Sequence, residues 1–519
     1  MRVVNPLRFL SILGMVFVLA CQSAAPGAGT PGPAATPAPT KLTVILSATV
    51  DFLDVHTAKR AESFDVISNF AEGFVGRDPQ TMAPIPSLAL SWTTPDVNTW
   101  TFKLRTGVKF HNGEAFDAEA VKYNLTRVMD PKLPSAIGPT LVGIVASVEA
   151  TDASTLTIRT KTPTPFLLER VMRLWFVPPK ESAEKGPDYV SSHPVGTGPY
   201  KFVSWTPGQS VVLTRNEGYW GPKPAYKDIT FREVLESGTA LAELIAGSAD
   251  IVKLIPNDQF DFVNRSGKAS VQVVESQTVV ETAVDQLGRG GPTPWTNKLV
   301  RQAANHAIDR ESIAKNLMGG RGKAVGTTFA PLAFGYDAAL KPYPYDLAKA
   351  KQLLTEAGFP NGFDSEIKVY PLGAFVDQNI LGQALVADLA KAGIRLKITQ
   401  VSSTEIGALV QGGKAGPVFL RQNQGAGTFD AALYFGFYTT GSVFSYYKND
   451  EVEKIRVQAA STADQNQRKT LYAQAQKLLY DDPGAIYGWV GFVANGVSNS
   501  VSIPVQPDAV LRLFLAKPK

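Results

Sequence analysis

Residues 377–401 read DQNILGQALVADLAKAGIRLKITQV, a stretch that contains two kinds of regular pattern in turn. Its first part places apolar side chains at helical spacing, at Ile380, Leu381, Ala384, Leu385 and Leu389. Asp377 is a residue type that caps helix starts, and Gly393 is the type that most often ends a helix. From Ile394 to Val401 apolar and polar residues alternate, as they do in a half-buried strand. The stretch therefore predicts a helix followed directly by a strand.

The same signals recur elsewhere along the chain. We predict strands over four segments, 41–46, 98–105, 154–160 and 211–216. We predict further helices after Asp117, over 347–357 behind Asp346, and over 466–480. This mixture favours layered α/β domains over a helical bundle or a β-sandwich.

The composition is that of a large globular protein. The chain has 519 residues, 44% of them hydrophobic and 19% charged, and this length predicts two to four domains. The 44 glycines are too few for collagen, and a single cysteine cannot build a disulfide scaffold. The net charge is only +5 and Lys and Arg are scattered, so we expect no nucleic-acid partner.

The first residues predict an exported protein. Arg2 and Arg8 precede an apolar run over 9–20, which is too short to span a bilayer but suits a signal peptide over 1–20. The run ends in Val-Leu-Ala before Cys21, which resembles the bacterial lipobox. Cys21 is the only cysteine of the chain, so we expect it to be lipidated. The alternative is an ordinary signal peptide that is cut a few residues later.

The segment that follows is predicted to be a spacer. After Cys21, residues 22–40 carry no charge and no large apolar side chain, and they include five prolines. Such a sequence cannot bury a core, so 21–40 is interpreted as a lipidated cysteine with a Pro/Ala/Gly linker. The expected location is extracytoplasmic, in the periplasm or on the outer face of the cell membrane, with the lipid as the only membrane contact.

Four blocks of sequence resemble one known family. They are Ser87–Trp92 with Trp100–Val121, Pro194–Phe202 with Arg215–Trp220, Val300–Ile313, and Tyr345–Gly362. Their order and spacing resemble the bacterial extracytoplasmic solute-binding proteins of ABC importers, in the oligopeptide, dipeptide and nickel-binding family (family 5). Each block also has a structural interpretation; Gly196–Tyr200, for example, reads as a turn before a strand. The blocks therefore indicate the fold and not the ligand.

The resemblance implies a type II periplasmic-binding-protein fold, α/β in class, with two lobes. The first lobe would comprise 41–73, 194–283 and 485–519, and the second 284–484, while an extra α/β domain over 74–193 would sit on the first. A small solute or peptide would bind between the lobes and pass to ABC permease and ATPase subunits. The family implies a monomer that is no enzyme and needs no cofactor.

The ligand contacts are inferred from the resemblance. Peptide-binding members hold the free amine with an Asp on a loop after a strand, and we expect that strand to begin at Phe429-Asp430. The anchoring position would then fall at about Thr439, yet no acid occurs between Asp430 and Asp450. The segment is aromatic instead, so Tyr434, Phe437, Tyr438 and Thr439 are candidate cleft residues, with ordinary core as the alternative.

Three cations are further candidates. Arg421 lies in the Gly-rich stretch 412–427 and could meet a carboxylate or phosphate, unless it is a solvated loop arginine. The resemblance places Lys59 and Arg60 in a loop that contacts ligand. None of the four histidines, at 56, 111, 193 and 306, has a partner at metal-ligand spacing, so we expect no metal.

The expected function is that of a lipid-anchored receptor of an ABC importer that binds a short peptide. The missing acid and the aromatic run make an oligosaccharide or another non-amine solute the main alternative. A sensory or chaperone-like receptor on the same fold is a further one. A hydrolase is remote, because the two Ser-x-x-Lys matches at 182–185 and 312–315 lack their partner motifs.

Overall fold

The computed structural model describes residues 40–371, 376–424 and 427–519. The predicted signal peptide, Cys21 and the linker up to residue 39 lie outside the described residues. Within the described ranges, no helix has the length and apolar content needed to cross a membrane.

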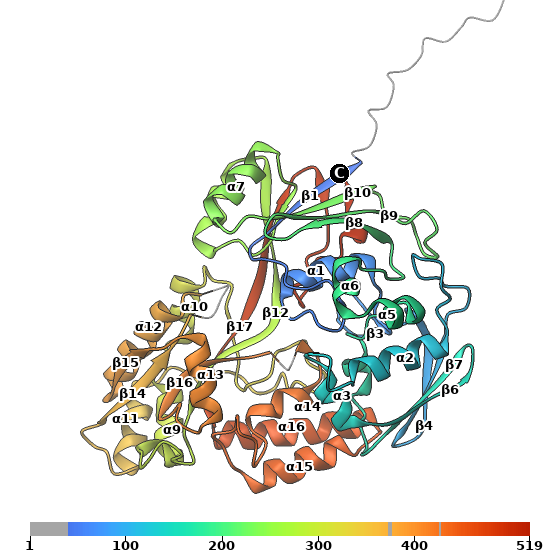
Figure 1. The fold of residues 1–519 in the computed structure, drawn as a ribbon. Helices are drawn as coiled ribbons and strands as arrows, with labels where there is room; N and C mark the ends of the chain where they lie inside the picture. The colour runs from blue at the N-terminus through green and yellow to red at the C-terminus, as the bar shows by residue number, and fades with distance from the viewer. Residues whose placement is uncertain (1–39, 372–375, 425–426) are drawn as a thin grey trace, which may run out of the picture. The chain divides into compact units, whose positions relative to one another are not determined.

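An 11-stranded sheet dominates the described part of the chain. Its path runs through β15 (Ile394–Gln400), β14 (Phe363–Val369), β16 (Val418–Asn423), β12 (Ala269–Val284), β17 (Ala485–Ser498), β11 (Ile251–Val252), β1 (Lys41–Leu46), β10 (Asp228–Glu233), β9 (Ser210–Arg215) and β8 (Tyr200–Thr206), with β13 (Lys323–Ala324) paired to β17. The long strands β12 and β17 pair antiparallel at the centre of the sheet and connect its two halves, as Figure 1 shows. One half is β11-β1-β10-β9-β8 and the other is β16-β14-β15.

Helices pack on both halves. The structure contains α1 (Ala61–Phe70) and α7 (Ser237–Ala246) beside the first half, and α9 (Lys298–His306), α10 (Arg310–Leu317), α11 (Leu347–Glu356) and α12 (Gln378–Ala392) beside the second. The helix and strand predicted over 377–401 are confirmed as α12 and β15. Asp377 accepts hydrogen bonds from the amides of Asn379 and Ile380, and Gly393 ends the helix at a φ of 103°.

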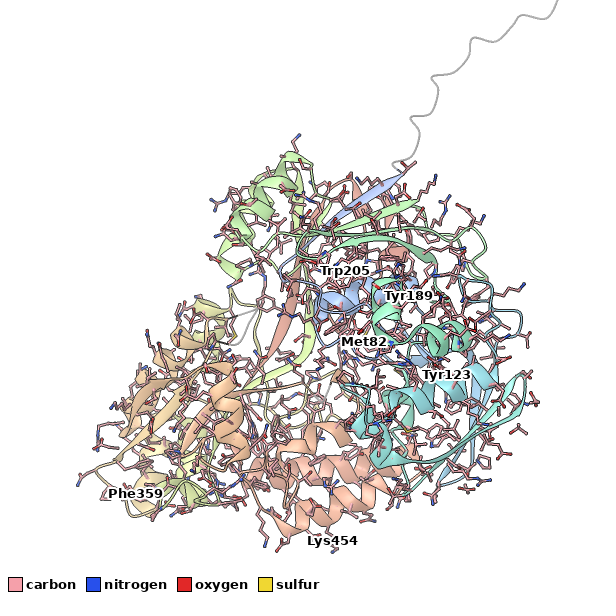
Figure 2. The ribbon with its side chains drawn as sticks, viewed as in Figure 1. Met82, Tyr123, Tyr189, Trp205, Phe359 and Lys454 are labelled. Atoms are coloured by element: carbon pink, nitrogen blue, oxygen red, sulfur yellow. The ribbon has the colours of Figure 1, made fainter. Side chains whose placement is uncertain are left out.

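A separate four-stranded antiparallel sheet has the order β4-β5-β7-β6. Its strands are β4 (Ala89–Asp96), β5 (Thr99–Leu104), β7 (Thr155–Thr160) and β6 (Val145–Asp152). Trp100, Phe102 and Leu104 of β5 are buried, as their alternation predicts, and α2 (Ala118–Val128) contacts β6 and β7. Tyr123 of α2, labelled in Figure 2, accepts a hydrogen bond from Ser182 of α5 (2.9 Å).

The remaining elements complete the described chain. The helices are α3 (Gly138–Ile144), α4 (Leu167–Val171), α5 (Pro179–Lys185), α6 (Pro187–Ser192), α8 (Phe260–Arg265), α13 (Ser403–Gln411), α14 (Ala431–Tyr434), α15 (Asp450–Ala460) and α16 (Gln465–Asp481). The 3-10 turns are η1 (Asn257–Gln259), η2 (Pro294–Thr296), η4 (Phe435–Phe437) and η5 (Leu513–Leu515). Two small sheets pair β2 (Gly76–Arg77) with β3 (Pro84–Ile85) and β18 (Val501–Ser502) with β19 (Lys517–Pro518).

The other predicted elements are also present, with one exception. The four strands appear as β1, β5, β7 and β9, and the three helices as α2, α11 and α16. The predicted strand from Phe429 is wrong, because the chain forms α14 and η4 there. Asp430 caps α14 by accepting from the amide of Ala432 (2.9 Å), and its carboxylate pairs with Arg468 (2.8 Å). A capping residue thus starts a helix where the aromatic composition suggests a strand.

The first two sequence blocks contact each other. His111 Nε2 lies 3.0 Å from the carbonyl oxygen of Gly198, and its Nδ1 accepts from the amide of Gly196 (3.3 Å). A Cβ on Gly196 would lie 2.2 Å from the carbonyl oxygen of Phe70, so only glycine fits this close approach. These residues join the four-stranded sheet region to the large sheet.

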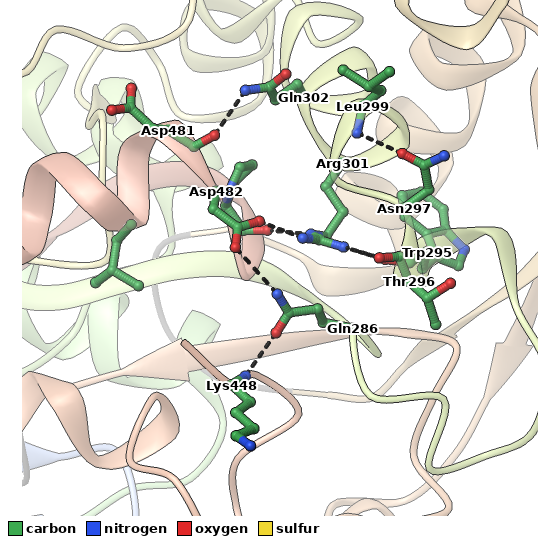
Figure 3. A network of polar contacts seen from close by, with 12 residues as sticks. Gln286, Trp295, Thr296, Asn297, Leu299, Arg301, Gln302, Lys448, Asp481 and Asp482 are labelled. Atoms are coloured by element: carbon green, nitrogen blue, oxygen red, sulfur yellow. Dashed lines mark hydrogen bonds and ion pairs between the residues drawn. The ribbon is translucent and has the colours of Figure 1, made fainter. Parts of the chain in front are cut away.

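The third block ties α9 to the start of β17. Figure 3 shows Arg301 donating to the carbonyl oxygens of Trp295 and Thr296 (both 2.8 Å) and pairing with Asp482. Gln286 donates to the same carboxylate (3.4 Å) and accepts from the amide of Lys448 (2.7 Å). The role of this block is therefore structural. The predicted lobe boundaries stay predictions.

Candidate functional site

A cavity of about 500 Å³ lies beside the middle of β12 and β17. Its lining comes from seven separate parts of the chain, namely Lys59, Ala61 and Phe64; Arg173; Leu254; Ser276, Gln277 and Thr278; Gln422, Gln424 and Gly427; Phe492 and Val493; and Pro507, Asp508 and Ala509. Both halves of the large sheet thus contribute, together with Arg173 from the segment that follows α4. A cavity at such a junction is a common position for a small-molecule site.

A bulge in β12 turns three consecutive side chains toward the cavity. Glu275 pairs with Phe492 and Val279 pairs with Val490, so residues 276–278 face a single residue of β17. An extra residue in one strand bends it and redirects side chains, and bulges occur often beside functional sites. Here the bulge brings Ser276, Gln277 and Thr278 together at the wall of the cavity.

Two other lining residues have unusual backbone conformations. Leu254 has a φ of 56° and Ala509 a φ of 61°. Positive φ costs free energy for residues other than glycine, and such residues concentrate at binding and catalytic sites. The strained positions support a functional role for this cavity.

Arg173 presents an unpaired guanidinium to the cavity. It forms no hydrogen bond or ion pair with any residue that the structure describes. Its guanidinium lies over the ring of Phe64 (5.5 Å to the centroid) and against Gly427, where a Cβ would come within 2.5 Å of Nη1. Burial lowers the pKa of Arg173, and the nearby Asp508 partly offsets this effect.

The acids near Arg173 already have partners. Asp508 accepts from both terminal nitrogens of Arg512 (2.7 and 3.0 Å), and Arg512 keeps the pKa of Asp508 below its usual value although burial acts to raise it. Glu169 accepts from Arg77 (2.8 Å) and from the amide of Phe429 (3.0 Å). Both acids are thus neutralised by other arginines. Arg173 and the exposed Lys59 therefore give the cavity a positive charge.

Gln277 adds an unsatisfied neutral group. The residue Gln277 is 8% exposed, and its amide oxygen is buried without a hydrogen-bond partner in the described structure. A buried acceptor of this kind is costly unless something donates to it. The lining thus combines the cation Arg173 with the neutral amide of Gln277, whose oxygen is turned away from solvent.

The sequence-predicted site residues separate into two groups. Lys59 lines the cavity, and its contact with a ligand stays a prediction. Arg60 is exposed and donates to Thr49 Oγ1 (2.7 Å), outside the lining. Arg421 lies on β16 and is buried, so the alternative of a solvated loop arginine is wrong.

Arg421 belongs to a polar group that we call the Glu281 cluster: Glu281, Thr328, Arg421, Asn423 and Tyr438. Arg421 Nε donates to Glu281 (2.7 Å), and the rings of Phe437 and Tyr438 cover its guanidinium at 4.5 and 5.1 Å. Tyr438 and Thr328 also donate to Glu281, at 3.1 and 3.2 Å. Burial raises the pKa of Tyr438, and the nearby Glu281 raises it further. Arg421 acts in the opposite direction.

The remaining predicted site residues lie outside the lining of the cavity. Tyr434 is fully buried and donates from its hydroxyl to the carbonyl oxygen of Gln277 (2.7 Å), which fixes the bulge. Thr439 donates to the carbonyl oxygen of Phe435 (3.0 Å). None of Tyr434, Phe437, Tyr438 and Thr439 lines this cavity. Their packing, and not a strand, explains the aromatic run.

Some lining residues could have been found from the sequence. Along β16, Gln422 and Gln424 alternate with the buried Arg421 and Asn423, so strand periodicity separates the two sets. Ser276–Thr278 belong to Glu275–Thr278, the longest polar run of β12. Arg173 carries no such signal, because its position depends on contacts that are distant in sequence.

A second cavity of about 280 Å³ shares Arg173 and Asp508 with the first. It contains Glu72, whose carboxylate accepts from Tyr219 (2.8 Å) and from the indole of Trp220 (2.9 Å). Burial raises the pKa of Glu72 to about 7. Within the described ranges, no group of three or more His, Cys, Asp and Glu residues could hold a metal ion.

Comparison with known proteins gives one consistent family. The model of "Bacterial extracellular solute-binding proteins, family 5 Middle" matches residues 83–447. The glutathione-binding protein GsiB of Pectobacterium atrosepticum is 30% identical over 484 residues, which cover 90% of this chain and 92% of the relative. GsiB of Escherichia coli K12 is 29% identical over 456 residues, covering 83% and 85%.

Solved structures agree in fold. HbpA2 from Haemophilus parasuis superposes with a TM-score of 0.83 at 22% identity, covering 92% of this chain and all of the other. DppA from Helicobacter pylori, in complex with the peptide STSA, gives 0.75 at 24% identity, covering 93% and 98%. MoaA from A. tumefaciens R10, in complex with mannopinic acid, gives 0.73 at 25% identity, covering 93% and 100%.

Proposed function

Because the chain belongs to the bacterial extracellular solute-binding proteins of family 5, we propose that it binds a short peptide or peptide-like solute for an ABC importer. The family is non-enzymatic, so the task of the chain is recognition and delivery. The named relatives bind glutathione and the superposed DppA binds a tetrapeptide, which supports a peptide-like solute here.

The cavity beside the bulge of β12 is the observation that carries this proposal. It combines strained backbone at Leu254 and Ala509 with the half-buried Arg173, which has no ion-pair partner among the described residues, and with Gln277, whose amide oxygen is buried without a partner there. Strained residues and polar groups without protein partners are enriched at functional sites. We propose that the solute binds here and contacts Lys59 as well.

Solute binding is coupled to delivery through a change of conformation. Residues on both halves of the sheet line the cavity, while β12 and β17 connect the halves. A solute that contacts both halves stabilises the closed arrangement by its difference in affinity for the two states. The permease then recognises the closed, loaded receptor.

Lipid anchoring through Cys21 is the second part of the proposal. It rests on the lipobox-like end of the apolar run and on the uncharged linker that follows. Full-length chain expressed in a bacterium with labelled palmitate should incorporate the label and stay in the membrane fraction. Cys21→Ala should lose both, whereas a soluble, unlabelled wild-type chain would disprove the anchor.

A thermal-shift screen tests the solute class. The full chain is mixed with glutathione, with di- to hexapeptides and with oligosaccharides, and the unfolding midpoint is recorded. A solute at one hundred times its Kd adds about 2.7 kcal/mol to stability, so a binding peptide raises the midpoint by several degrees. A response to oligosaccharides alone would contradict a peptide-like solute and favour the sugar alternative.

A further inference from the structure

Glu169 joins two regions of the molecule that are distant in sequence. It lies on α4, whose Leu167 and Val171 pack in the hydrophobic core of the four-stranded sheet. Its Oε2 accepts a hydrogen bond from the backbone amide of Phe429 (3.0 Å), which stands two residues before α14. The bond therefore runs from the region of the four-stranded sheet to the segment that leads into α14.

Arg77 extends this contact to a group of three residues, which we call the Glu169 cluster: Arg77, Glu169 and Phe429. Arg77 Nη2 donates to the same oxygen of Glu169 (2.8 Å), and its guanidinium lies over the ring of Phe429, 4.9 Å from the centroid. All three residues are largely removed from solvent. Charge pairs and cation–ring contacts are stronger where water is excluded, so the cluster is suited to hold two regions together.

Phe429 is firmly fixed within its own region. Its carbonyl oxygen accepts from the amide of Phe334 (2.6 Å), and the next residue, Asp430, pairs with Arg468 of α16 (2.8 Å). The amide of Ala431 in turn donates to the carbonyl oxygen of Phe334 (2.9 Å). The Glu169 cluster is therefore a contact between two packed regions and not a local turn.

The two segments that the cluster joins both reach the solute cavity. Arg173 lies four residues after Glu169, Gly427 lies two residues before Phe429, and both line the cavity. A Cβ on Gly427 would lie 2.5 Å from Nη1 of Arg173, so the two segments are also in close contact at the lining. No residue of the Glu169 cluster is itself part of the lining. The cluster can thus act on a solute only by positioning the walls of the cavity.

We propose that the Glu169 cluster is a latch that holds the region of the four-stranded sheet against α14 and α16, and that it slows the release of a solute that it does not contact. This inference rests on the proposed function, in which closing of the receptor brings the two regions together. A contact that forms only in the closed state stabilises that state and so lowers the rate of opening. Glu169 is then a positioning residue, and the four-stranded sheet takes part in solute retention.

Two variants and one control separate the latch from general stability. Glu169→Gln removes the negative charge and leaves Arg77 buried without a carboxylate. The double variant Arg77→Met with Glu169→Met replaces the ion pair by apolar side chains of similar size, an exchange that is often neutral for stability. The control, Asp482→Asn, leaves Arg301 buried without a carboxylate, and Asp482 lies outside both the cluster and the cavity lining.

Hydrogen exchange on the purified full-length chain without solute tests the latch itself. In the double variant, we expect the amide of Phe429 to exchange roughly 5- to 150-fold faster than in the wild type, the usual range of coupling between sites. The radius of gyration from small-angle X-ray scattering should rise in the same variant. In Asp482→Asn this exchange rate should stay within about twofold of the wild type, because distant sites act independently.

Surface plasmon resonance with glutathione and with the peptide Ser-Thr-Ser-Ala tests the effect on the solute. Both latch variants should release a probe that binds the wild type roughly 5- to 150-fold faster, while the association rate changes little. The double variant should keep an unfolding midpoint close to that of the wild type. Asp482→Asn should show the reverse, with a lower midpoint and an unchanged rate of release.

The two measurements distinguish failure of the latch from failure of the proposed function. Equal exchange at Phe429 in the wild type and the double variant would overturn the latch and leave the proposed function standing. Faster exchange with an unchanged rate of release would overturn its effect on the solute. If neither probe binds the wild type, the peptide-like solute class is contradicted, and the exchange and scattering results still decide whether the latch exists.

Discussion

The cavity and the Glu281 cluster lie on opposite faces of β16, and they differ in how their charges are satisfied. In the cluster, Glu281 and Arg421 stand directly opposite each other in the strand register and are covered by Tyr438. Across the strand, the guanidinium of Arg173 and the amide of Gln277 have no partners in the described structure. Glu281 and Arg421 are therefore paired within the fold, whereas Arg173 lines a cavity without a protein partner.

Breaking the buried pair should give the largest loss of stability. Arg421→Met leaves Glu281 buried without its cation, and we expect the free energy of unfolding to fall by about 3–5 kcal/mol. The measurement is equilibrium denaturation in urea. The double variant Arg421→Met with Glu281→Gln should recover part of the loss, and a single variant as stable as the wild type would contradict the structural role of the cluster.

Glu72 should make stability depend on pH with an unusual sign. Its pKa is raised to about 7 by burial from an ordinary value of 4.5, so the folded protein holds a proton that the unfolded chain releases. The resulting contribution is fully present below pH 4.5 and is lost as the pH rises through 7. At pH 8 we expect Glu72→Gln to be more stable relative to the wild type than at pH 4.5, by no more than about 3 kcal/mol. A difference between the two proteins that stays constant with pH would show that Glu72 titrates normally.

A neutral member of the Glu281 cluster should have an intermediate effect. Thr328 donates to Glu281 (3.2 Å) and accepts from Asn423 (2.7 Å). Thr328→Val keeps the shape but removes both hydrogen bonds, so we expect a loss of about 1–3 kcal/mol in the free energy of unfolding. Thermal and urea denaturation of this variant check the value; no measurable loss would mean that the cluster depends on the ion pair alone.

The corresponding change in the cavity should not reduce stability. Gln277→Met removes an amide whose oxygen is buried without a partner, so we expect the free energy of unfolding to stay the same or to rise by up to about 1 kcal/mol. The same variant should bind a peptide-like solute more weakly. A large loss of stability would show that the side chain of Gln277 supports the fold in a way that the cavity geometry does not suggest.

Local signals were enough to predict much of the fold. Capping aspartates such as Asp377 and Asp117 and the glycine stop at Gly393 act within a few residues, so their helices follow from sequence. The predicted two-lobed α/β class is confirmed by superposition with TM-scores up to 0.83. The strand predicted around Asp430 is wrong. The aromatic side chains favour a strand, but a helix cap and tertiary packing decide the structure of this segment.

The site was harder to predict than the fold. Of the predicted contacts, Lys59 lines the cavity, and the aromatic candidates and Arg421 lie behind it. Gln422, the neighbour of Arg421 on β16, lines the cavity, and Arg421 does not. Arg173 could not be found at all, because its role depends on Phe64, Gly427 and Asp508, which only the folded chain brings together.

One pair of variants tests most directly whether the solute binds in the cavity and not at the aromatic segment. Gln422→Trp fills the cavity, whereas Thr439→Trp adds the same side chain at the position where an anchoring residue was first expected. With the solute that responds in the thermal-shift screen, we predict that calorimetry finds at least a hundredfold loss of affinity for Gln422→Trp, roughly 2.7 kcal/mol. Thr439→Trp should stay within about threefold of the wild type. Unchanged binding by Gln422→Trp together with lost binding by Thr439→Trp would contradict the account.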